Sequence, residues 1–390
     1  MPNTNPLYTG MPTTIFEVMS RLAMEHNAVN LGQGFPDVDG PDDVRRVAAQ
    51  ALIEGPNQYP PMMGLPELRQ AVARSEKRFF GIEREPADVV VTSGATEALS
   101  DCFMALIEPG DEVVLFDPSY DCYVPLIKRA GGVPKIIPLN PPNWTFTDVD
   151  LDAVFSSKTK ALLLNNPLNP ASKVFPRGDL ERLADRVVAH DAIGICDEVY
   201  EHLIFSGAEH VSLATLPGMA ERSVRIGSAG KSFSLTGWKV GYVSGPSNLI
   251  APISKAHQFT TFTTPPHLQK AVAYGLGLPD SYFQQLAADL EAKRDRLAVG
   301  LQRLGFSTLQ ADGSYFLIAD IAGLGLGDDV EAAKRMTIEA GVTTVPMSAF
   351  YQKAAPQNLL RFCFCKRDEV LDEALSRIEA WRARGFSAAA

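Results

Sequence analysis

Short apolar runs alternate with longer amphipathic stretches from about residue 45 to residue 285, and this alternation constrains the fold more than any other feature. The apolar runs have the length of strands, and the stretches between them have the length of helices. The pattern predicts βαβ units that form a mostly parallel sheet with helices on both faces, which is an α/β fold. The predicted strands are residues 88–92, 112–116, 161–164, 192–196, 223–227 and 240–244.

The rest of the chain predicts a second, smaller α/β domain. Residues 281–304 carry leucines at near-helical spacing with charges between them, so we expect one long amphipathic helix that links the two domains. An apolar run at 313–321, a helix near 330–340 and a strand around Arg361 follow it. With 390 residues and 46% hydrophobic content, the chain can bury two cores. The expected parts are an N-terminal segment 1–44 that joins the small domain, a large domain 45–285 and a small domain 286–390.

Charge and cysteine content narrow the possible partners. The net charge is −10 and no basic stripe is present, which argues against a nucleic-acid partner. The first residues have no cationic start, and no apolar run approaches the ~20 residues that cross a bilayer, so we expect a cytoplasmic protein without membrane contact. The five cysteines form no C-x-x-C pair, so we expect reduced thiols and no metal site. Cys363 and Cys365 alternate on the predicted strand and therefore share one buried face.

Lys231 lies among small and hydroxyl-bearing residues in the segment 227–239, which ends in a second lysine, Lys239. An amine held beside a phosphate site suggests a Schiff-base lysine and a phosphorylated aldehyde cofactor. Gly-Lys-Ser also ends the phosphate loop of nucleotide hydrolases, G-x-x-x-x-G-K-[ST]. That motif requires glycine at the position of Arg225, where a side chain would block the close backbone approach. A purely structural turn is the remaining alternative.

Asp197 is the candidate partner for the ring nitrogen of a pyridoxal cofactor. It ends an apolar run and therefore lies at the carboxyl edge of the predicted sheet, where a buried carboxylate would keep that nitrogen protonated. Two alternatives remain open here. Asp197 could begin a solvated helix, or it could belong to a metal site with Glu198 and His202 at i, i+4, although no second histidine follows at ligand spacing.

Other loops at predicted strand ends supply further candidates for cofactor contacts. Asn169 and Tyr200 could donate hydrogen bonds to the ring oxygen, although the Asn-Pro steps around Asn169 also predict a simple turn. Residues 93–96 follow a strand and open a helix, so Ser93, Ala95 and Thr96 could bind a phosphate with Ser228 and Lys239, or could merely cap the helix. Tyr120 could stack on the ring or lie in the core.

These motifs together resemble a known family over essentially the whole chain. Residues 30–37, 227–241 and 361–364 are similar to the branch that contains kynurenine aminotransferase, glutamine transaminase K and bacterial methionine aminotransferase, and this branch carries lysine at Lys239. The motifs that occur in the order seen in fold-type I, class I aminotransferases are Gly34, Ser93–Thr96, the run 166–170, Asp197-x-x-Tyr200, Ser228-x-x-Lys231 and Arg361.

The resemblance implies a pyridoxal 5′-phosphate cofactor and a role for each residue. Lys231 would form the imine and shuttle the proton, and Asp197 would pair with the ring nitrogen. Arg361 would bind the substrate α-carboxylate, helped by Gly34 and Asn169, because its planar donors match a carboxylate. Tyr59 is similar to the tyrosine that reaches a neighbouring subunit's phosphate, which implies a homodimer with shared active sites. The other implied contacts are Asn169 and Tyr200 with the ring oxygen, Tyr120 with the ring face, and Ala95, Thr96, Ser228 and Lys239 with the phosphate.

The implied reaction is transfer of an amino group from an L-amino acid to a 2-oxoacid. Phe16, Tyr120, Phe262 and Phe350 predict a pocket for large apolar, sulfur-bearing or aromatic side chains, with methionine, glutamine, phenylalanine and kynurenine as candidates. Overlapping substrates are expected, because one methylene is worth only ~1–3 kcal/mol in such pockets.

Four positions depart from the family pattern. Residues 171–172 are Ala-Ser, Phe16 stands where the animal kynurenine enzymes carry tryptophan, and Thr96 stands where they carry tyrosine. The side-chain pocket is therefore expected to differ from theirs. Alternatives are a cysteine-conjugate or cystathionine-type carbon–sulfur β-lyase on the same scaffold and, more remotely, the nucleotide hydrolase. A cofactor-sensing transcriptional regulator would need a DNA-binding domain, for which we expect no room because the resemblance begins near Thr14.

Overall fold

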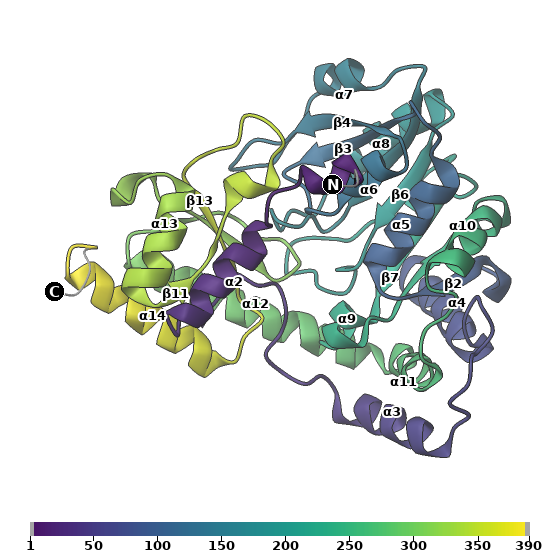
Figure 1. The fold of residues 1–390 in the computed structure, drawn as a ribbon, viewed down its shortest axis with the longest axis horizontal. Helices are drawn as coiled ribbons and strands as arrows, with labels where there is room; N and C mark the ends of the chain where they lie inside the picture. The colour runs from purple at the N-terminus through teal and green to yellow at the C-terminus, as the bar shows by residue number, and fades with distance from the viewer. Residues whose placement is uncertain (1–3, 387–390) are drawn as a thin grey trace.

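A seven-stranded sheet forms the centre of the larger part of the molecule (Figure 1). The structure is a computed structural model that describes residues 4–386. Neighbouring strands are parallel except β8, which is antiparallel to both β2 and β7. The predicted, mostly parallel α/β sheet is therefore confirmed. In spatial order the strands are β2 (Val89–Thr92), β8 (Gly241–Ser244), β7 (Ser223–Ser228), β6 (Ile193–Asp197), β5 (Thr159–Asn165), β3 (Glu112–Asp117) and β4 (Val133–Pro138).

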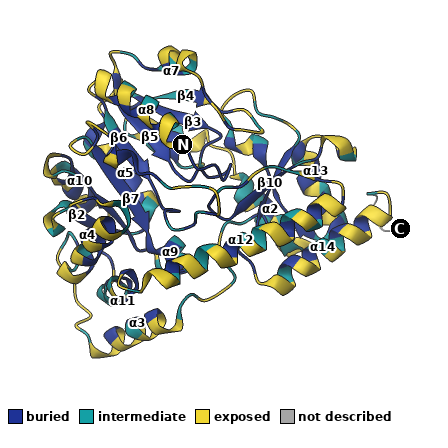
Figure 2. Ribbon diagram, turned by 180° about the vertical axis from the view of Figure 1, so that it is seen from behind, coloured by how far each residue is buried: buried dark blue, intermediate teal, exposed yellow. Residues whose placement is uncertain are grey.

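Helices cover both faces of this sheet, and apart from the edge strand β4 the strands between them are almost entirely buried (Figure 2). Along β3, Val113 and Leu115 enter one core while Val114 and Phe116 enter the other. This double burial explains why the strands are continuous apolar runs in the sequence. The helices of this part are α3 (Asp42–Glu54), α4 (Pro66–Phe80), α5 (Ala95–Leu106), α6 (Tyr123–Arg129), α7 (Asp148–Val154), α8 (Arg177–Ala189), α9 (Ala229–Ser232), α10 (Ser247–Thr260) and α11 (Pro266–Leu276).

The edge strand β4 is not among the strands predicted from the sequence. Its residues, VPKIIP, include Pro134 and Pro138, and proline cannot donate a hydrogen bond to a neighbouring strand. Such a segment is tolerated only at the edge of a sheet, and β4 is the last strand in the order. The tertiary position therefore decides a conformation that local composition does not indicate.

The smaller part contains a four-stranded antiparallel sheet and a two-stranded parallel one. The two-stranded sheet pairs β1 (Val29–Asn30) with β11 (Val342–Thr343), so the N-terminal segment joins this part. The long helix α12 (Asp280–Arg303) runs across the predicted boundary at 285/286, and the exact domain limits stay a prediction. The other elements are β12 (Val345–Pro346), β13 (Leu359–Cys363), β10 (Phe316–Asp320), β9 (Ser307–Thr308), α1 (Pro6–Thr9), α2 (Ile15–Glu25), α13 (Asp329–Arg335) with a π-helical turn (Met336–Ala340), and α14 (Asp368–Ala383).

Four polar residues are the last residues of parallel strands in the large sheet. Asp117 ends β3, Asn165 ends β5, Asp197 ends β6 and Ser228 ends β7. Asn165 and Asp197 are also direct partners in the strand register. Because the carboxyl ends of parallel strands meet at one edge, these groups gather where ligands of open α/β sheets bind.

Candidate functional site

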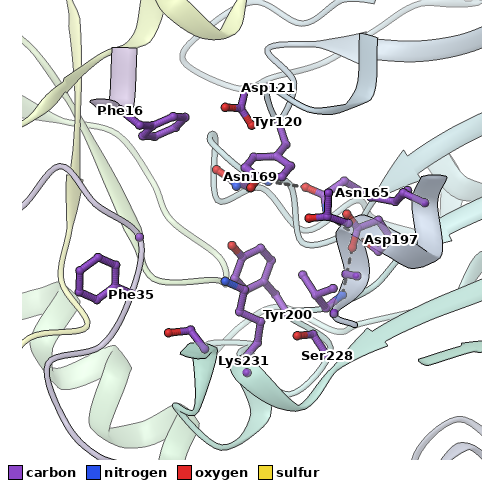
Figure 3. Close-up of a pocket in the computed structure, with 18 of the residues that line it drawn as sticks. Phe16, Phe35, Tyr120, Asp121, Asn165, Asn169, Asp197, Tyr200, Ser228 and Lys231 are labelled. Atoms are coloured by element: carbon purple, nitrogen blue, oxygen red, sulfur yellow. Dashed lines mark hydrogen bonds between the residues drawn. The ribbon is translucent and has the colours of Figure 1, made fainter. Parts of the chain in front are cut away.

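A cavity of about 470 Å³ opens at this carboxyl edge, and residues of both parts of the molecule line it (Figure 3). The larger part contributes the loops that follow the parallel strands, and the smaller part contributes Phe16, Phe316 and Arg361. The sequence-predicted residues that line it are Phe16, Gly34, Ala95, Thr96, Tyr120, Asn169, Asp197, Tyr200, Ser228, Lys231, Lys239 and Arg361.

Four predicted residues lie outside the cavity. Phe350 is 2% exposed and packs edge-on against Phe16 at 5.6 Å between ring centroids, and its ring lies 4.7 Å from the guanidinium carbon of Arg361, so it supports the lining instead of forming it. Ser93 belongs to the loop between β2 and α5, but its backbone N–H donates to the Glu97 carboxylate. Tyr59 and Phe262 form an edge-on pair on the surface of the chain, with 84% and 39% of their areas exposed, so neither faces this chain's own cavity.

Lys231 lies on the short helix α9, directly after β7, and its amine enters the cavity. Nζ donates a hydrogen bond of 2.8 Å to the hydroxyl of Tyr315. Burial lowers the pKa of Lys231, while the carboxylate of Asp197 acts in the opposite direction. A lowered pKa increases the fraction of neutral amine, which is the form that adds to an aldehyde and accepts a proton.

Asp197 is a buried carboxylate without a cationic partner within salt-bridge distance among residues 4–386. It accepts a 2.6 Å hydrogen bond from the Tyr123 hydroxyl, and burial raises the pKa of Asp197 to about 6. An ionised group in such a place is costly unless a positive charge joins it. The site therefore suits a ligand with a protonated ring nitrogen, and the residues present fit a pyridoxal cofactor.

Arg361 reaches the cavity from β13 and is 1% exposed. Its Nη1 donates to Asn169 Oδ1 at 2.9 Å and its Nη2 donates to the Gly32 carbonyl at 3.0 Å. Nε is buried without a hydrogen-bond partner, and no carboxylate of the described residues pairs with the guanidinium. Burial lowers the pKa of Arg361 to about 10, so the group stays charged at neutral pH. A buried, unpaired guanidinium is suited to binding a carboxylate of a ligand.

The opposite end of the cavity forms a cradle for an anion. Helix α5 begins there, after Gly94, and the first amides of a helix are free donors at its positive end. Gly94 has φ +76°, and an added Cβ would lie 3.3 Å from Lys239 Nζ. A side chain on Gly241 would fall 2.6 Å from the Gly94 carbonyl carbon, so close backbone packing requires glycine at both positions. The backbone amides, Lys239 and Ser228 together resemble a phosphate site.

A buried charged cluster supports this cradle, and sequence reasoning missed it. His257 places Nδ1 2.8 Å from Glu97 Oε1 and Nε2 3.0 Å from the Met62 carbonyl. Burial opposes a charge on the ring, but the hydrogen bond with Glu97 and the charges of Glu97 and Asp101 together outweigh it and raise the pKa of His257, which favours a ring with two protons that donates to both neighbours. Asp101 lies 3.7 Å from the same Nδ1, and burial raises the pKa of Asp101 to about 7. These three side chains lie close enough to ligate a metal, but the protons on His257 already account for the arrangement.

Two further residues of the site were not singled out from the sequence. Tyr123 lies three residues beyond Tyr120 and holds Asp197, while Tyr315 contacts Lys231 from just before β10. Neither lies in a recognisable motif. Asn165 was also missed. Its Oδ1 accepts a hydrogen bond of 2.7 Å from the backbone N–H of Asn169, and its Nδ2 donates one of 2.9 Å to the Asp197 carbonyl.

The metal alternative at Glu198 and His202 is not supported. Glu198 pairs with Arg225 at 2.7 Å, whereas His202 packs among the rings of Phe79 and Phe283 at 4.7 and 4.3 Å between centroids. Arg225 itself is buried among glutamates, so the residues before Lys231 do not form a phosphate loop of a nucleotide hydrolase. Within residues 4–386, no helix combines the length and apolar character that a membrane crossing requires.

Comparison with known proteins identifies the family. The model for aminotransferase class I and II matches residues 26–378. The chain is 43% identical over 379 residues to the probable N-succinyldiaminopimelate aminotransferase DapC of Mycobacterium tuberculosis, which covers 94% of this chain and 95% of that protein. It is 40% identical over 367 residues to the methionine aminotransferase of Escherichia coli K12, with coverage of 94% and 95%. It is 39% identical over 406 residues to kynurenine–oxoglutarate transaminase 3 of Mus musculus, with coverage of 96% and 89%.

Solved structures agree with these relatives. N-succinyldiaminopimelate aminotransferase from M. tuberculosis superimposes with a TM-score of 0.94 at 42% identity, covering 97% of this chain and all of that one. The E. coli protein with a methionine aminotransferase function also gives 0.94, at 38% identity and with coverage of 97% and 99%. This chain therefore belongs to the class I and II aminotransferases and is a pyridoxal 5′-phosphate-dependent transaminase that acts on amino acids and 2-oxoacids.

Proposed function

We propose that the amino donor is an L-amino acid with a large apolar, sulfur-bearing or aromatic side chain, such as methionine, glutamine, phenylalanine or kynurenine. The observation that carries this proposal is the aromatic content of the cavity lining, to which Phe16, Phe35 and Tyr120 contribute (Figure 3). Aromatic walls favour apolar and aromatic groups through burial and ring contacts. Two relatives are named for methionine and kynurenine, which supports the same class.

N-succinyldiaminopimelate, named in another relative, suits the cavity less well. The cationic residues of the lining are Lys231, Lys239 and Arg361, and the proposed chemistry uses all three. The two acidic residues of the lining are Asp197, which is proposed to hold the ring nitrogen, and Asp121, which would repel an acidic side chain. A substrate with carboxylates beyond its α-carboxylate would therefore meet repulsion instead of a counter-ion within this chain's lining.

The residues of the site have the following proposed roles. Arg361, with Asn169 and Gly34, binds the α-carboxylate and so orients the α-hydrogen toward the Lys231 amine. Lys231 Nζ, when neutral, removes that proton and returns it to a neighbouring carbon of the bound group. Pyridoxal phosphate, when bound, supplies the aldehyde carbon for imine exchange and a ring that delocalises the electrons of the α-carbon. Asp197 binds the ring nitrogen, Asn169 and Tyr200 bind the ring oxygen, and Tyr120 packs on the ring face. The phosphate is bound by Ala95, Thr96, Ser228 and Lys239.

We also propose a homodimer in which each copy completes the other's site. Tyr59 and Phe262 form an aromatic pair that is largely exposed on the single chain, and exposed aromatic clusters favour protein interfaces. Phe259, near the end of α10 and three residues before Phe262, is also 86% exposed. A second copy that covers this surface would bring Tyr59 and Phe262 to the partner's cavity, as their predicted roles require.

The experiment compares donors on the purified holoenzyme. Amino transfer to a 2-oxoacid with an uncharged side chain is measured with methionine, glutamine, phenylalanine and kynurenine as donors. The same transfer is measured with aspartate and N-succinyldiaminopimelate for comparison. We expect kcat/KM for the best neutral donor to exceed that for both acidic donors by at least about 10-fold. A higher value for either acidic donor would overturn the substrate proposal. A cysteine conjugate that yields pyruvate and ammonia, with no transfer from any donor, would instead identify a carbon–sulfur β-lyase.

A further inference from the structure

The hydroxyl of Tyr315 lies between two groups with proposed roles in the reaction. It accepts a hydrogen bond of 2.8 Å from Lys231 Nζ and donates one of 2.7 Å to the Gly34 carbonyl. Tyr315 is 1% exposed, so water does not compete for either bond. Because its single O–H is used by Gly34, the phenol can only accept from the amine.

This direction has a consequence for Lys231. A neutral amine has two N–H donors and one lone pair. If one N–H is given to Tyr315, the rotation of the amine is restricted while its lone pair remains available for a proton. The amine is therefore held in a defined orientation, and its lone pair makes no hydrogen bond to Tyr315.

The residue after Tyr315 connects the same point of the chain to Arg361. The Phe316 ring lies 3.9 Å from the guanidinium carbon of Arg361. A Cβ added to Gly34 would lie 2.7 Å from the same ring, so the segment that carries Gly34 packs directly on Phe316. Consecutive residues thus contact the amine that moves the proton and the guanidinium that binds the carboxylate.

We propose that Tyr315 is a positioning residue that holds the released amine of Lys231 in line with the α-hydrogen of a substrate bound at Arg361. The inference rests on the proposed role of Lys231 as the base. The orientation of the Tyr315 hydroxyl depends on its hydrogen bond to the Gly34 carbonyl. The Lys231 amine is therefore correctly oriented only while the N-terminal segment is packed against β10. Misplacement of a reacting group by about 1 Å can cost about 100-fold in rate, so one hydrogen bond at this point has a large effect.

The test is Tyr315→Phe, which keeps the ring and removes the hydroxyl. The matched control is Tyr351→Phe, because the Tyr351 hydroxyl also donates to a backbone carbonyl, that of Leu139, away from the cavity. Both holoenzymes are mixed rapidly with methionine carrying hydrogen or deuterium at the α-carbon. We expect Tyr315→Phe to slow proton transfer by about 10- to 100-fold with an increased isotope effect, while the substrate Kd changes less than about threefold. The control should match the wild type.

A second readout uses the apoprotein and needs no turnover. Lys231 is labelled with an amine reagent over a range of pH, and mass spectrometry follows the extent at this residue. The phenol oxygen favours the charged amine, so its loss should move the labelling midpoint of Lys231 down by about 0.5 to 1 pH unit. A variant with the wild-type Tm, proton-transfer rate and labelling midpoint would overturn the inference. Failure of the underlying role is distinguishable, because Lys231→Ala would then keep the wild-type rate of proton transfer from methionine.

Discussion

The two sides of the cavity differ in how the chain builds them. On the cofactor side, Asp197 and Asn165 end neighbouring strands, are buried and make hydrogen bonds of 2.6 to 2.9 Å. On the substrate side, Phe16 and Phe35 come from the N-terminal segment, and Phe35 is 44% exposed. A rigid sheet edge thus carries the groups proposed for chemistry, whereas mobile or variable segments are the usual place for selectivity. Substitutions should therefore abolish reaction on the first side and change substrate preference on the second.

The largest effect is expected for Lys231→Ala on the cofactor side. The other lysine of the cavity lining, Lys239, is assigned to the phosphate, so turnover should fall by at least about 1,000-fold. The visible absorption band of the wild-type holoenzyme and its pyridoxyl adduct after borohydride reduction should also disappear. The control is Lys334→Ala, on an exposed face of α13, which should keep the band and the activity. Unchanged turnover in Lys231→Ala would refute the assigned role.

A smaller but still large effect is expected where the two sides meet, at Arg361. Arg361→Lys keeps the charge but loses the planar pair of donors and the packing of the guanidinium on Phe316. We expect kcat/KM for methionine to fall by about 10- to 100-fold, mainly through KM. A primary amine that lacks the α-carboxylate serves as the control substrate. Its ratio of variant to wild-type rate should be near one, and an equal loss for both substrates would show that Arg361 acts only through packing.

Much of the cofactor side could be predicted from the sequence, because its residues follow apolar runs in a fixed order. Asp197, Ser228 and Lys231 lie beside predicted strands, and the alternation of runs is a local signal. Tyr123, Tyr315 and His257 could not be predicted in the same way. Their contacts join Tyr123 to β6, Tyr315 to Gly34 and His257 to α5, which are pairings across the fold. Such pairings depend on how layers pack, and one sequence carries no local pattern for them.

The substrate side was predicted less well for the same reason. Phe350 and Phe16 are both aromatic, yet only Phe16 faces the cavity, and Phe350 supports it from behind. Which of two aromatic side chains lines a wall depends on how the N-terminal segment packs against the loop before β13. Tyr59 and Phe262 pose a further problem, since their proposed site lies on another copy of the chain. Their roles stay predictions until the dimer is tested.

An intermediate effect, on stability, tests whether the cluster below the phosphate cradle belongs to the rigid side. Burial raises the pKa of Asp101 to about 7, well above the value of a free aspartate. The folded state then binds more protons than the unfolded one between about pH 4 and pH 7, so unfolding becomes easier as the pH rises through that range. Urea unfolding gives the free energy of unfolding at pH 5.5 and at pH 8. Its decrease between these two pH values should be about 1 to 3 kcal/mol larger for the wild type than for Asp101→Asn. Equal declines would contradict this account.

The smallest effect is expected at Asp121, on the substrate side. Its carboxylate lies on the same side of the cavity as Phe16 (Figure 3), exposed at the opening. Repulsion between exposed charges several ångströms apart is worth about 1 kcal/mol, so Asp121→Asn should raise kcat/KM for aspartate by about three- to tenfold. Methionine has no side-chain charge and should change by less than about twofold, and added salt should reduce the gain for aspartate. A lower kcat/KM with both donors would show that the reaction itself requires Asp121. The substrate side would then not differ from the cofactor side at that residue.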